Sequence, residues 1–397
     1  MRVYNIDFFD IDTMENIHHD MVAAEELSID YDYLSPSTNE IEITKTDKLS
    51  KRNIVYIHGL YSYIGIITNI DTDDDKTTVS FDSFLKLFDH DAKFRFKPNF
   101  TYSLEQHIRD MIIYYWAYNG SDDPYQGLKT LSVYNVTIAN ISNPTNDWSL
   151  GIEAIDDDRP NVAICNLLSD VIEPALKKYG ILVDVSLDFS NKCIKIIIDK
   201  VADDSATFMI DADQNNVEIE SFSIQDPNTE TNKLEIWDTN SLTYDISNHK
   251  KITYYLYKKS ENGDTGPFSY KYGTSAPDGY SRITPVVIET TYTAESGEQY
   301  DDDGNANEDY KSFEEMAKEK AQDTFDGMDY ENLIELKMSL EDFLINPQSM
   351  RFGTLVRIYH DGVSYASILT GKKIETEITL VFGSIRHDLT KILKASK

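Results

Sequence analysis

Runs of β-branched and aromatic residues predict β-strands over the first hundred residues. Asn53–His58 and Tyr63–Ile70 have this character, and the polar run Asp71–Lys76 separates the second of them from the strand-like Thr77–Val79. The apolar spacing then changes to that of a helix, which indicates a short amphipathic helical turn at the end of the segment. Its apolar residues are Phe81, Phe84, Leu85 and Phe88.

A longer helix is predicted just after residue 100. Ser103 and Gln106 have the spacing of a capping box, in which two side chains satisfy free backbone N–H groups at a helix start. Gly120 is the predicted stop, since glycine commonly ends helices. The apolar face comprises Leu104, Ile108, Met111, Ile112 and Tyr115.

A second helix is predicted over about Asn161–Tyr179, with Gly180 as its C-terminal stop. Pro174 lies inside this stretch and should kink or split the helix, because proline lacks the N–H that the helix needs. A hairpin follows, since apolar and polar residues alternate through Val183–Phe189 and again through Ile194–Ile198.

Strand-like segments return between residues 201 and 300, separated by polar loops. The acidic, glycine-containing stretch 293–311 indicates an exposed or mobile loop. A third helix is predicted from Ser312, with Glu315 at the capping-box position, to about Gly327.

The last segment is again predicted to be β-structure. Ile334, Leu336 and Met338 alternate with polar residues, and Ile378–Phe382 is a further apolar strand. Between them, Asp361-Gly362 predicts a hairpin turn, because both residues tolerate positive φ.

These elements predict an α+β fold that is predominantly antiparallel β, with β-rich ends and α/β and β inserts between them. We expect a β-rich N-terminal domain over residues 1–98 and an α/β insert over 99–200. A β-rich domain with the acidic loop and a helix is expected over 201–330, and closing strands over 331–397. No internal repeat of a fixed period is visible.

Composition narrows the class of protein. The 26 Tyr and 17 Phe residues in 397 predict folded domains with cores, because disordered chains are poor in aromatics. There are 37 Lys and Arg against 69 Asp and Glu, which gives a net charge of −32. Such a charge repels polyanions, so we expect neither sequence-specific nucleic-acid binding nor binding to anionic membranes.

The two cysteines, Cys165 and Cys193, cannot form a disulfide-dense framework and have no metal-ligand spacing. We expect buried free thiols, as in a protein assembled in a reducing cytosol. The N-terminal residues lack the apolar stretch of a secretory signal. The longest apolar run, about Met111–Tyr118, is too short to span a membrane, so a soluble protein is expected.

The sequence contains none of the motifs G-x-S-x-G, H-E-x-x-H or G-x-G-x-x-G. Gly371-Lys372 comes nearest to a phosphate-binding loop, but Ala366 replaces the first glycine, and Lys373 the Ser or Thr that would hold magnesium. We therefore predict no catalytic residue and no cofactor site, and we expect that the protein is not an enzyme.

Acidic runs offer candidate cation sites. In Gln299–Tyr310, the best calcium candidate, the first and last positions of the loop lack the required carboxylates. The runs Asp73–Asp75 and Asp156–Asp158 are interpreted as hydrated loop tips. No metal site is predicted from any of them.

The histidines are scattered through the chain. His18 and His19 are adjacent, so their side chains should diverge rather than form a metal pair. His58, His360 and His387 lie in or beside predicted strands and are interpreted as structural histidines.

Several segments, in order, resemble the tail-associated family of siphophage tail-tip hub proteins, which is related to the trimeric baseplate hub of contractile phages. The run Tyr61–Asp91 contains the family's aromatic-x-Gly-Ile-Ile strand as Tyr63–Ile67, then a polar turn, and Leu-Phe-Asp as Leu87–Asp89. The later segments that resemble the family are Asn232–Asp238, Ile252–Lys258, Ser281–Val287, Ser312–Phe325, Glu331–Met338 and Phe352–Lys394.

The resemblance implies a structural protein with two barrel-like domains per chain, and a homotrimer whose barrels form a pseudo-sixfold ring. It further implies docking on a hexameric distal tail protein, and contacts with the tape measure protein and with other baseplate or receptor-binding proteins. The virion's distal tail tip is the implied location, after assembly in the host cytoplasm. There the trimer would close the tail tube and open for DNA exit, and the acidic charge would suit a conduit that repels passing DNA.

Two alternatives stay open. A tail-tip cell-wall hydrolase would need a placed carboxyl group with a raised pKa. The lysin domain that many relatives carry is not expected, since the chain stops soon after Leu389–Lys391. A carbohydrate-binding receptor module is suggested by the aromatic content, although Trp116, Trp148 and Trp237 are the only tryptophans.

Overall fold

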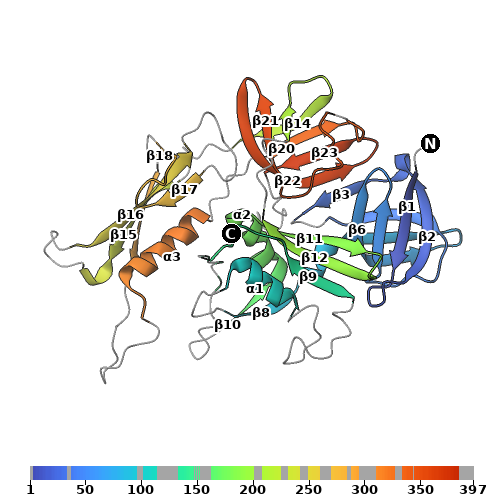
Figure 1. The fold of residues 1–397 in the computed structure, drawn as a ribbon, viewed down its shortest axis with the longest axis horizontal. Helices are drawn as coiled ribbons and strands as arrows, with labels where there is room; N and C mark the ends of the chain where they lie inside the picture. The colour runs from blue at the N-terminus through green and yellow to red at the C-terminus, as the bar shows by residue number, and fades with distance from the viewer. Residues whose placement is uncertain are drawn as a thin grey trace. The chain divides into compact units, whose positions relative to one another are not determined.

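The computed structural model describes residues 3–33, 37–95, 102–113, 133–146, 148, 150, 152, 162–200, 208–224, 231–241, 249–259, 270–283, 288–294, 310–326, 333–342 and 344–383. The fold is α+β and predominantly antiparallel β, as predicted (Figure 1). It divides into two compact units, one of Met1–Phe222, Leu333–Asp361 and Ser367–Lys397, and one of Ser223–Asn332 and Gly362–Ala366. Among the described residues, no helix is both long enough and apolar enough to cross a membrane. The four-domain division remains a prediction.

The first sheet of unit one contains six strands in the order β2-β1-β5-β6-β7-β4. Asp20 on β2 accepts a hydrogen bond from the backbone N–H of Thr44 on β4 at 2.6 Å, so the two edge strands meet and the sheet curls into a barrel. Its fully buried core includes Ile6, Phe8 and Phe81. The strands are β1 (Val3–Phe9), β2 (Asn16–Ala23), β4 (Asn39–Thr44), β5 (Ile54–His58), β6 (Ser62–Thr72) and β7 (Lys76–Ser83).

The predicted strands and the turn after Tyr63–Ile70 are confirmed by β5, β6 and β7, and the predicted helical turn by the 3-10 helix Phe84–Phe88. Phe81, which was assigned to that helical turn, lies instead in β7, because its side chain is on the buried face of the strand. Gly65 explains the glycine of the Tyr63–Ile67 motif. A Cβ there would lie 2.7 Å from the carbonyl oxygen of Asp82 and 2.8 Å from the ring of Tyr63. Only glycine lets β6 pack this closely against β7 and its own neighbouring ring.

The second sheet of unit one has the strand order β13-β21-β22-β23-β20-β14, and β3 also pairs with β22. A strand from near the N-terminus therefore completes a sheet made mainly of C-terminal strands. The predicted Asp361-Gly362 turn is confirmed, with φ of 50° and 77°. The strands are β3 (Ile29–Asp32), β13 (Met209–Asp211), β14 (Val217–Ser223), β20 (Leu333–Met338), β21 (Leu355–His360), β22 (Val363–Ile374) and β23 (Ile378–Phe382).

The remainder of unit one is α/β. The predicted hairpin is present as β11 (Ile181–Asp188) and β12 (Cys193–Lys200), and β12 pairs in parallel with β9 (Tyr134–Ile138). Helix α1 (Leu104–Met111) begins as predicted, because the Ser103 hydroxyl accepts from the Gln106 N–H at 3.3 Å. Its predicted stop, Gly120, lies outside the described residues. Both cysteines are free and buried, as expected.

The predicted helix over about 161–179 is wrong in its first part. Val162–Asn166 is strand β10, which pairs antiparallel with β8 (Asp91–Arg95). Asn166 then starts the helical part, because its side-chain oxygen accepts from two free N–H groups of the first turn, each at 3.0 Å. A π-helical segment, Leu167–Ile172, leads into α2 (Glu173–Tyr179), so Pro174 lies in the first turn of α2, where a missing N–H is tolerated. Gly180 ends α2 with φ 65°, as predicted.

The second unit is a five-stranded sheet with one helix packed against it. Helix α3 (Phe313–Asp326) begins as predicted, since Ser312 and Glu315 exchange capping bonds at 2.8 and 3.3 Å. Phe313, Ala317, Ala321 and Phe325 pack on Leu234, Ile236 and Leu256 of the sheet. The strands are β15 (Thr231–Asp238), β16 (Lys251–Lys259), β17 (Tyr270–Gly273), β18 (Tyr280–Arg282) and β19 (Ile288–Ala294).

Candidate functional site

The two large sheets of unit one contain the same four-strand arrangement. In the first, β4, β5, β6 and β7 follow one another along the chain and lie in the order β5-β6-β7-β4. In the second, β20, β21, β22 and β23 follow one another and lie in the order β21-β22-β23-β20. Strand connectivity and strand neighbours are therefore identical over four strands.

The irregularities of the two ladders also coincide. The β6–β7 register shifts between Ile67 and Asn69, and the β22–β23 register shifts between Leu369 and Gly371. The residue left out of register is a threonine in both sheets. Thr68 donates its hydroxyl to the carbonyl of Ser80 at 3.2 Å, and Thr370 to that of Val381 at 3.3 Å. Because a bulge bends a strand and increases its twist, both sheets curve at the same place.

The turns that lead into β5 and β21 match as well. Arg52 and Gly353 have left-handed backbones with φ of 73° and 75°. Arg52 donates its N–H to the carbonyl of Ile67 at 2.8 Å, and Gly353 to that of Leu369 at 2.9 Å. In each sheet the carbonyl of the next residue accepts a bond in return, from Ile67 to Asn53 at 2.9 Å and from Leu369 to Thr354 at 3.0 Å. Unit one thus contains an internal structural duplication, although few of the matched residues are identical.

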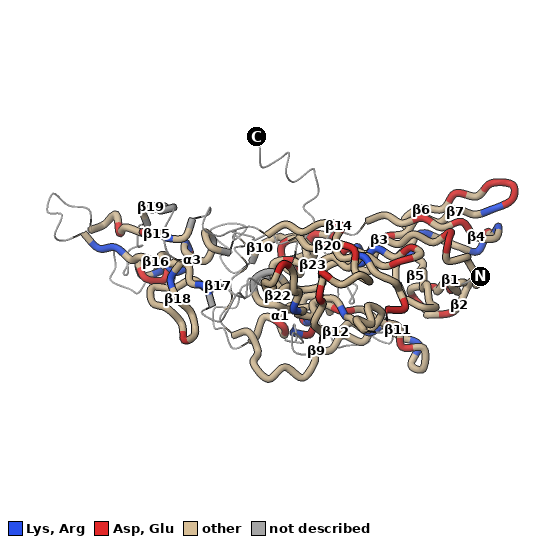
Figure 2. The backbone as a smooth tube through the Cα atoms, turned by 90° about the horizontal axis from the view of Figure 1, so that it is seen from above, with Lys and Arg blue, Asp and Glu red and all other residues tan. Residues whose placement is uncertain are grey.

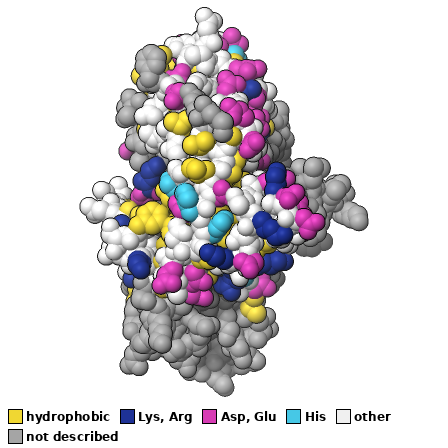
Figure 3. Space-filling view, turned by 90° about the vertical axis from the view of Figure 1, so that its right-hand side faces the viewer, with side chains coloured by type: hydrophobic (Ala, Val, Ile, Leu, Met, Phe, Trp, Pro, Cys, Tyr) yellow, Lys and Arg dark blue, Asp and Glu magenta, His cyan; other side chains and the backbone are white. Residues whose placement is uncertain are grey.

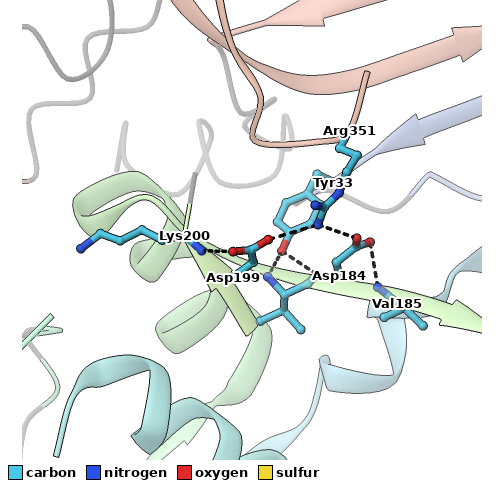
Figure 4. A network of polar contacts seen from close by, with 7 residues as sticks. Tyr33, Asp184, Val185, Asp199, Lys200 and Arg351 are labelled. Atoms are coloured by element: carbon cyan, nitrogen blue, oxygen red, sulfur yellow. Dashed lines mark hydrogen bonds and ion pairs between the residues drawn. The ribbon is translucent and has the colours of Figure 1, made fainter. Parts of the chain in front are cut away.

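A joint connects the β11–β12 hairpin to the second sheet (Figure 4). Tyr33, which follows β3, donates its hydroxyl to the carbonyl of Val183 at 2.8 Å and accepts from the Val183 N–H at 2.7 Å. Burial raises the pKa of Tyr33, which keeps the hydroxyl protonated and able to donate. Arg351, just before β21, reaches Asp184 at 3.0 Å and Asp199 at 3.4 Å.

The tip of the same hairpin rests on the first sheet. Phe189 lies with its ring centroid 5.6 Å from that of Phe9 and 5.5 Å from that of Tyr56. The hairpin is therefore fixed at its base by polar contacts and at its tip by aromatic ones. This arrangement resists rotation of the α/β part about a single contact.

Lys372 lies in the interior next to the joint. It is 3% exposed, and its ammonium group is 5.0 Å from the ring centre of Tyr61 and 5.5 Å from that of Phe352. It donates to the carbonyl of Met350. Burial lowers the pKa of Lys372 to about 7, and Asp184 opposes this shift. Gly371 and Lys372 lie within strand β22, so they do not form the loop that phosphate binding requires.

The predicted structural histidines take polar partners. His58 contacts Asp7 at 2.8 Å and His19 contacts the same carboxylate at 2.9 Å, while His18 lies against the ring of Phe8. These bonds hold the pKa of Asp7 below its usual value against the opposing effect of burial. Histidine side chains are visible on this side of the molecule among both cationic and acidic groups (Figure 3). His387 lies outside the described residues.

One group of described side chains has the composition of a metal site. Ligand atoms of Asp213, His360 and Asp361 lie within 4.8 Å of one another. Asp213 also accepts from His360 at 2.6 Å and from the backbone N–H of Asp361 at 2.9 Å, so it joins two turns. The sequence did not indicate this group, because Asp213 is far from the other two along the chain. The hydrogen bonds account for the arrangement without a cation.

The acidic candidates are loops. Asp73 accepts from the backbone N–H groups of Asp75 and Lys76 at 2.8 and 2.7 Å, which closes a turn through its own carboxylate. Asp156–Asp158 and all of Gln299–Tyr310 except Tyr310 lie outside the described residues.

Comparison with known proteins gives structural likeness only. Neither a protein-family model nor a curated protein matches the chain. Among solved structures, prophage tail protein gp18 from Listeria monocytogenes EGD-e is 12% identical, with a TM-score of 0.46 over 100% of this chain and 98% of that one. A chain of the phage P2 baseplate in its activated conformation with Ca is 14% identical, with a TM-score of 0.44 over 96% of this chain and 98% of that one. The 43 kDa tail protein of prophage MuSo2 from Shewanella oneidensis is 11% identical, with a TM-score of 0.42 over 96% of this chain and 93% of that one. TM-scores below 0.5 do not support a functional argument, so function has to be argued from this chain's own residues.

Proposed function

We propose that the chain is the structural hub of a bacteriophage tail tip or baseplate, and that it acts as a homotrimer. The observation that carries this proposal is the internal duplication of the sheets that contain Thr68 and Thr370. A chain with two similar barrels offers six similar surfaces when three copies assemble about a threefold axis. Such a ring can match the sixfold symmetry of a tail tube.

The sequence resemblance supports the same function. Its first motif, Tyr63–Ile67, lies in β6, where Gly65 is required by the close approach of β7. Its closing segment contains β21, β22 and β23, the duplicate of β5, β6 and β7. The first and the last of the segments that resemble the hub family therefore lie in the two barrels.

In this proposal the ring docks on a hexameric distal tail protein at the end of the virion's tail and contacts the tape measure protein and further baseplate or receptor-binding proteins. The α/β part, held by the joint at Tyr33 and Arg351, narrows or closes the tube. Its displacement opens the way for DNA. The net charge of −32 suits a conduit from which DNA is repelled. A basic lining of the assembled channel would contradict this last part.

The hydrolase alternative has less support. A cell-wall hydrolase needs a carboxyl group with a raised pKa to act as the general acid. Every described carboxyl group with a shifted pKa has it lowered, as the hydrogen bonds of Asp7 and Asp213 illustrate. We expect no clearing of peptidoglycan by the purified chain in a zymogram, and clearing would favour the hydrolase.

The carbohydrate-binding alternative also has less support. Of the tryptophans, Trp148 is buried, Lys251 covers the ring of Trp237 at 5.0 Å, and Trp116 lies outside the described residues. A sugar that stacks on Trp237 would have to displace the lysine. Binding of the isolated chain to host cell-wall polysaccharide would favour this alternative.

Electron microscopy of the purified chain mixed with a hexameric distal tail protein tests the assembly. We expect a closed ring with threefold symmetry and six similar barrel densities against the hexamer. Particles that contain one chain, or a ring with only three such densities, would contradict the proposal.

A further inference from the structure

The two duplicated sheets differ at one edge. In the second sheet, Gly371–Ile374 of β22 pairs with β3 on the side away from β23. By the register of the two ladders, the equivalent residues of β6 are Asn69–Thr72. Strand β5 pairs only with residues 62–66 of β6, so it does not reach them.

The backbone of Asn69–Thr72 is presented to solvent on that side. In an antiparallel ladder, successive residues alternate between bonding to one neighbour and facing the other. The Asp73 N–H donates to the carbonyl of Lys76, so Asp73 is a residue that bonds toward β7. By the alternation, Asp71 and Asn69 also bond toward β7, whereas the N–H and C=O groups of Ile70 and Thr72 point away from it. Within the described part of the chain, no backbone bond satisfies these groups.

The duplicate shows what such an edge binds. Lys372 and Ile374, the equivalents of Ile70 and Thr72, are opposite Tyr31 and Ile29 of β3. The added strand continues past the bulge, where the Tyr33 N–H donates to the carbonyl of Thr370 at 3.0 Å. The same bulge stands at Thr68 in β6, so the backbone there has the shape that accepts an antiparallel strand.

Charge selects the kind of strand. Asp71 and Asp73–Asp75 surround the free edge, and Figure 2 shows acidic residues gathered at this end of the β6–β7 hairpin. The hairpin's own lysine, Lys76, is paired with Glu42, and Lys45 of the preceding segment donates to the carbonyl of Asp74 at 3.2 Å. Acidic groups still outnumber basic ones at this edge. An acidic strand would be repelled from this edge. A basic strand would be attracted.

We propose that Asn69–Thr72 of β6 is a docking site for an extended, lysine- or arginine-rich segment of a different protein, which adds to the sheet as an antiparallel strand. Main-chain bonds to Ile70 and Thr72 provide affinity, and the surrounding aspartates provide selectivity. The inference rests on the strand register and holds whether or not the chain forms a trimer.

The test uses the full chain and two peptides of equal charge, Lys-Val-Lys-Val-Lys-Val and Lys-Pro-Lys-Pro-Lys-Pro, both with blocked ends. Hydrogen–deuterium exchange with fragment-level mass spectrometry reads the amides of Ile70 and Thr72. Before peptide is added, these amides should exchange rapidly while those of Lys372 and Ile374 are protected. The valine peptide should slow exchange at Ile70 and Thr72 by about tenfold. The proline peptide should not, because its prolines fix φ away from the strand value and remove half of its backbone N–H donors.

Variants of Thr72 provide the second measurement. Thr72→Pro removes the outward N–H, whereas Thr72→Val keeps it and serves as the matched control. We expect Thr72→Pro to bind the valine peptide about tenfold more weakly than Thr72→Val. If Thr72→Pro fails to fold, the hydrogen–deuterium exchange of the unaltered chain with the two peptides tests the proposal by itself. Slow exchange at Ile70 and Thr72 before peptide is added, or equal binding of both peptides, would overturn the proposal.

Discussion

Thr68 and Thr370 occupy equivalent bulges in two different sheets, and each donates its hydroxyl to the carbonyl across the ladder, at 3.2 and 3.3 Å. The two threonines are separated by most of the chain. They differ in burial, since Thr370 is 1% exposed and Thr68 is half-buried. The same bond should therefore contribute differently to stability in the two barrels.

Replacement of these hydroxyls tests that difference. Thr370→Val removes the hydroxyl that donates to the buried carbonyl of Val381 and should lower the free energy of unfolding by about 1–2 kcal/mol. Thr68→Val should cost less than about 1 kcal/mol, because water can replace the hydroxyl. Urea denaturation of both variants measures the two values. A larger loss of unfolding free energy for Thr68→Val than for Thr370→Val would contradict the difference in burial between the two threonines.

Gly65 should not tolerate a side chain. The Cβ of Gly65→Ala would lie 2.7 Å from a backbone carbonyl, so β6 or β7 must shift, at a cost of about 2–3 kcal/mol. The matched control is Gly279→Ala, where φ is +79° and no atom lies within 4 Å. That variant should lose only about 1 kcal/mol through backbone strain. Equal thermal stability of the two variants would show that β6 and β7 do not approach as described.

The joint should depend more on Tyr33 than on Arg351. Tyr33→Phe leaves the N–H and C=O of Val183 without their buried partner, which should cost about 2 kcal/mol and be insensitive to salt. Arg351→Gln removes contacts of a side chain that is 56% exposed, so it should cost at most about 1 kcal/mol. The Arg351→Gln loss should vanish at about 1 M salt, where exposed charges are screened. Denaturation at low and high salt distinguishes the two, and a salt-sensitive loss in Tyr33→Phe would be inconsistent with its role.

Lys372 should make stability depend on pH. Burial lowers the pKa of Lys372 to about 7 in the folded chain, against about 10.5 when it is unfolded. Between these values the unfolded chain binds one more proton, so the free energy of unfolding rises with pH, by up to about 1.4 kcal/mol per pH unit. The gain is absent below about pH 7, where the lysine is protonated in both states. Above about pH 10 the raised pKa of Tyr33 and Tyr61 reverses the trend, because tyrosines then ionise more readily in the unfolded chain.

Lys372→Met is the variant that isolates this effect. It should be more stable than the unaltered chain at pH 7 and should lose the rise between about pH 7 and 10. Thermal unfolding at a series of pH values provides the comparison. An unchanged pH profile in Lys372→Met would mean that another group is responsible.

Much of the local structure could be predicted because period-two alternation reports a strand with one buried face. The hairpin at Val183–Ile198 was found in this way. The turn at Asp361-Gly362 was found from its tolerance of positive φ, and the caps at Ser103 and Ser312 located two helix starts. Val162–Asn166 was assigned to a helix, since a short apolar run next to a helix has no period of its own.

Long-range features were not predictable from one sequence. The pairing of β3 with β22 joins residues more than three hundred positions apart. The duplication is hidden because it resides in backbone geometry. Arg52 and Gly353 share a left-handed φ but not a side chain, and sequence patterns record side chains. The joint at Tyr33, Val183 and Arg351 could not be predicted for the same reason, since Val183 takes part in it through its main chain.

Native mass spectrometry of the full chain, alone and with a hexameric distal tail protein, tests the central claim most directly. Two equivalent barrels in a chain of 45.5 kDa predict a closed assembly of three copies, with a mass of about 136.5 kDa. The same three copies should add to one hexamer. A strict monomer of 45.5 kDa under both conditions would contradict the account.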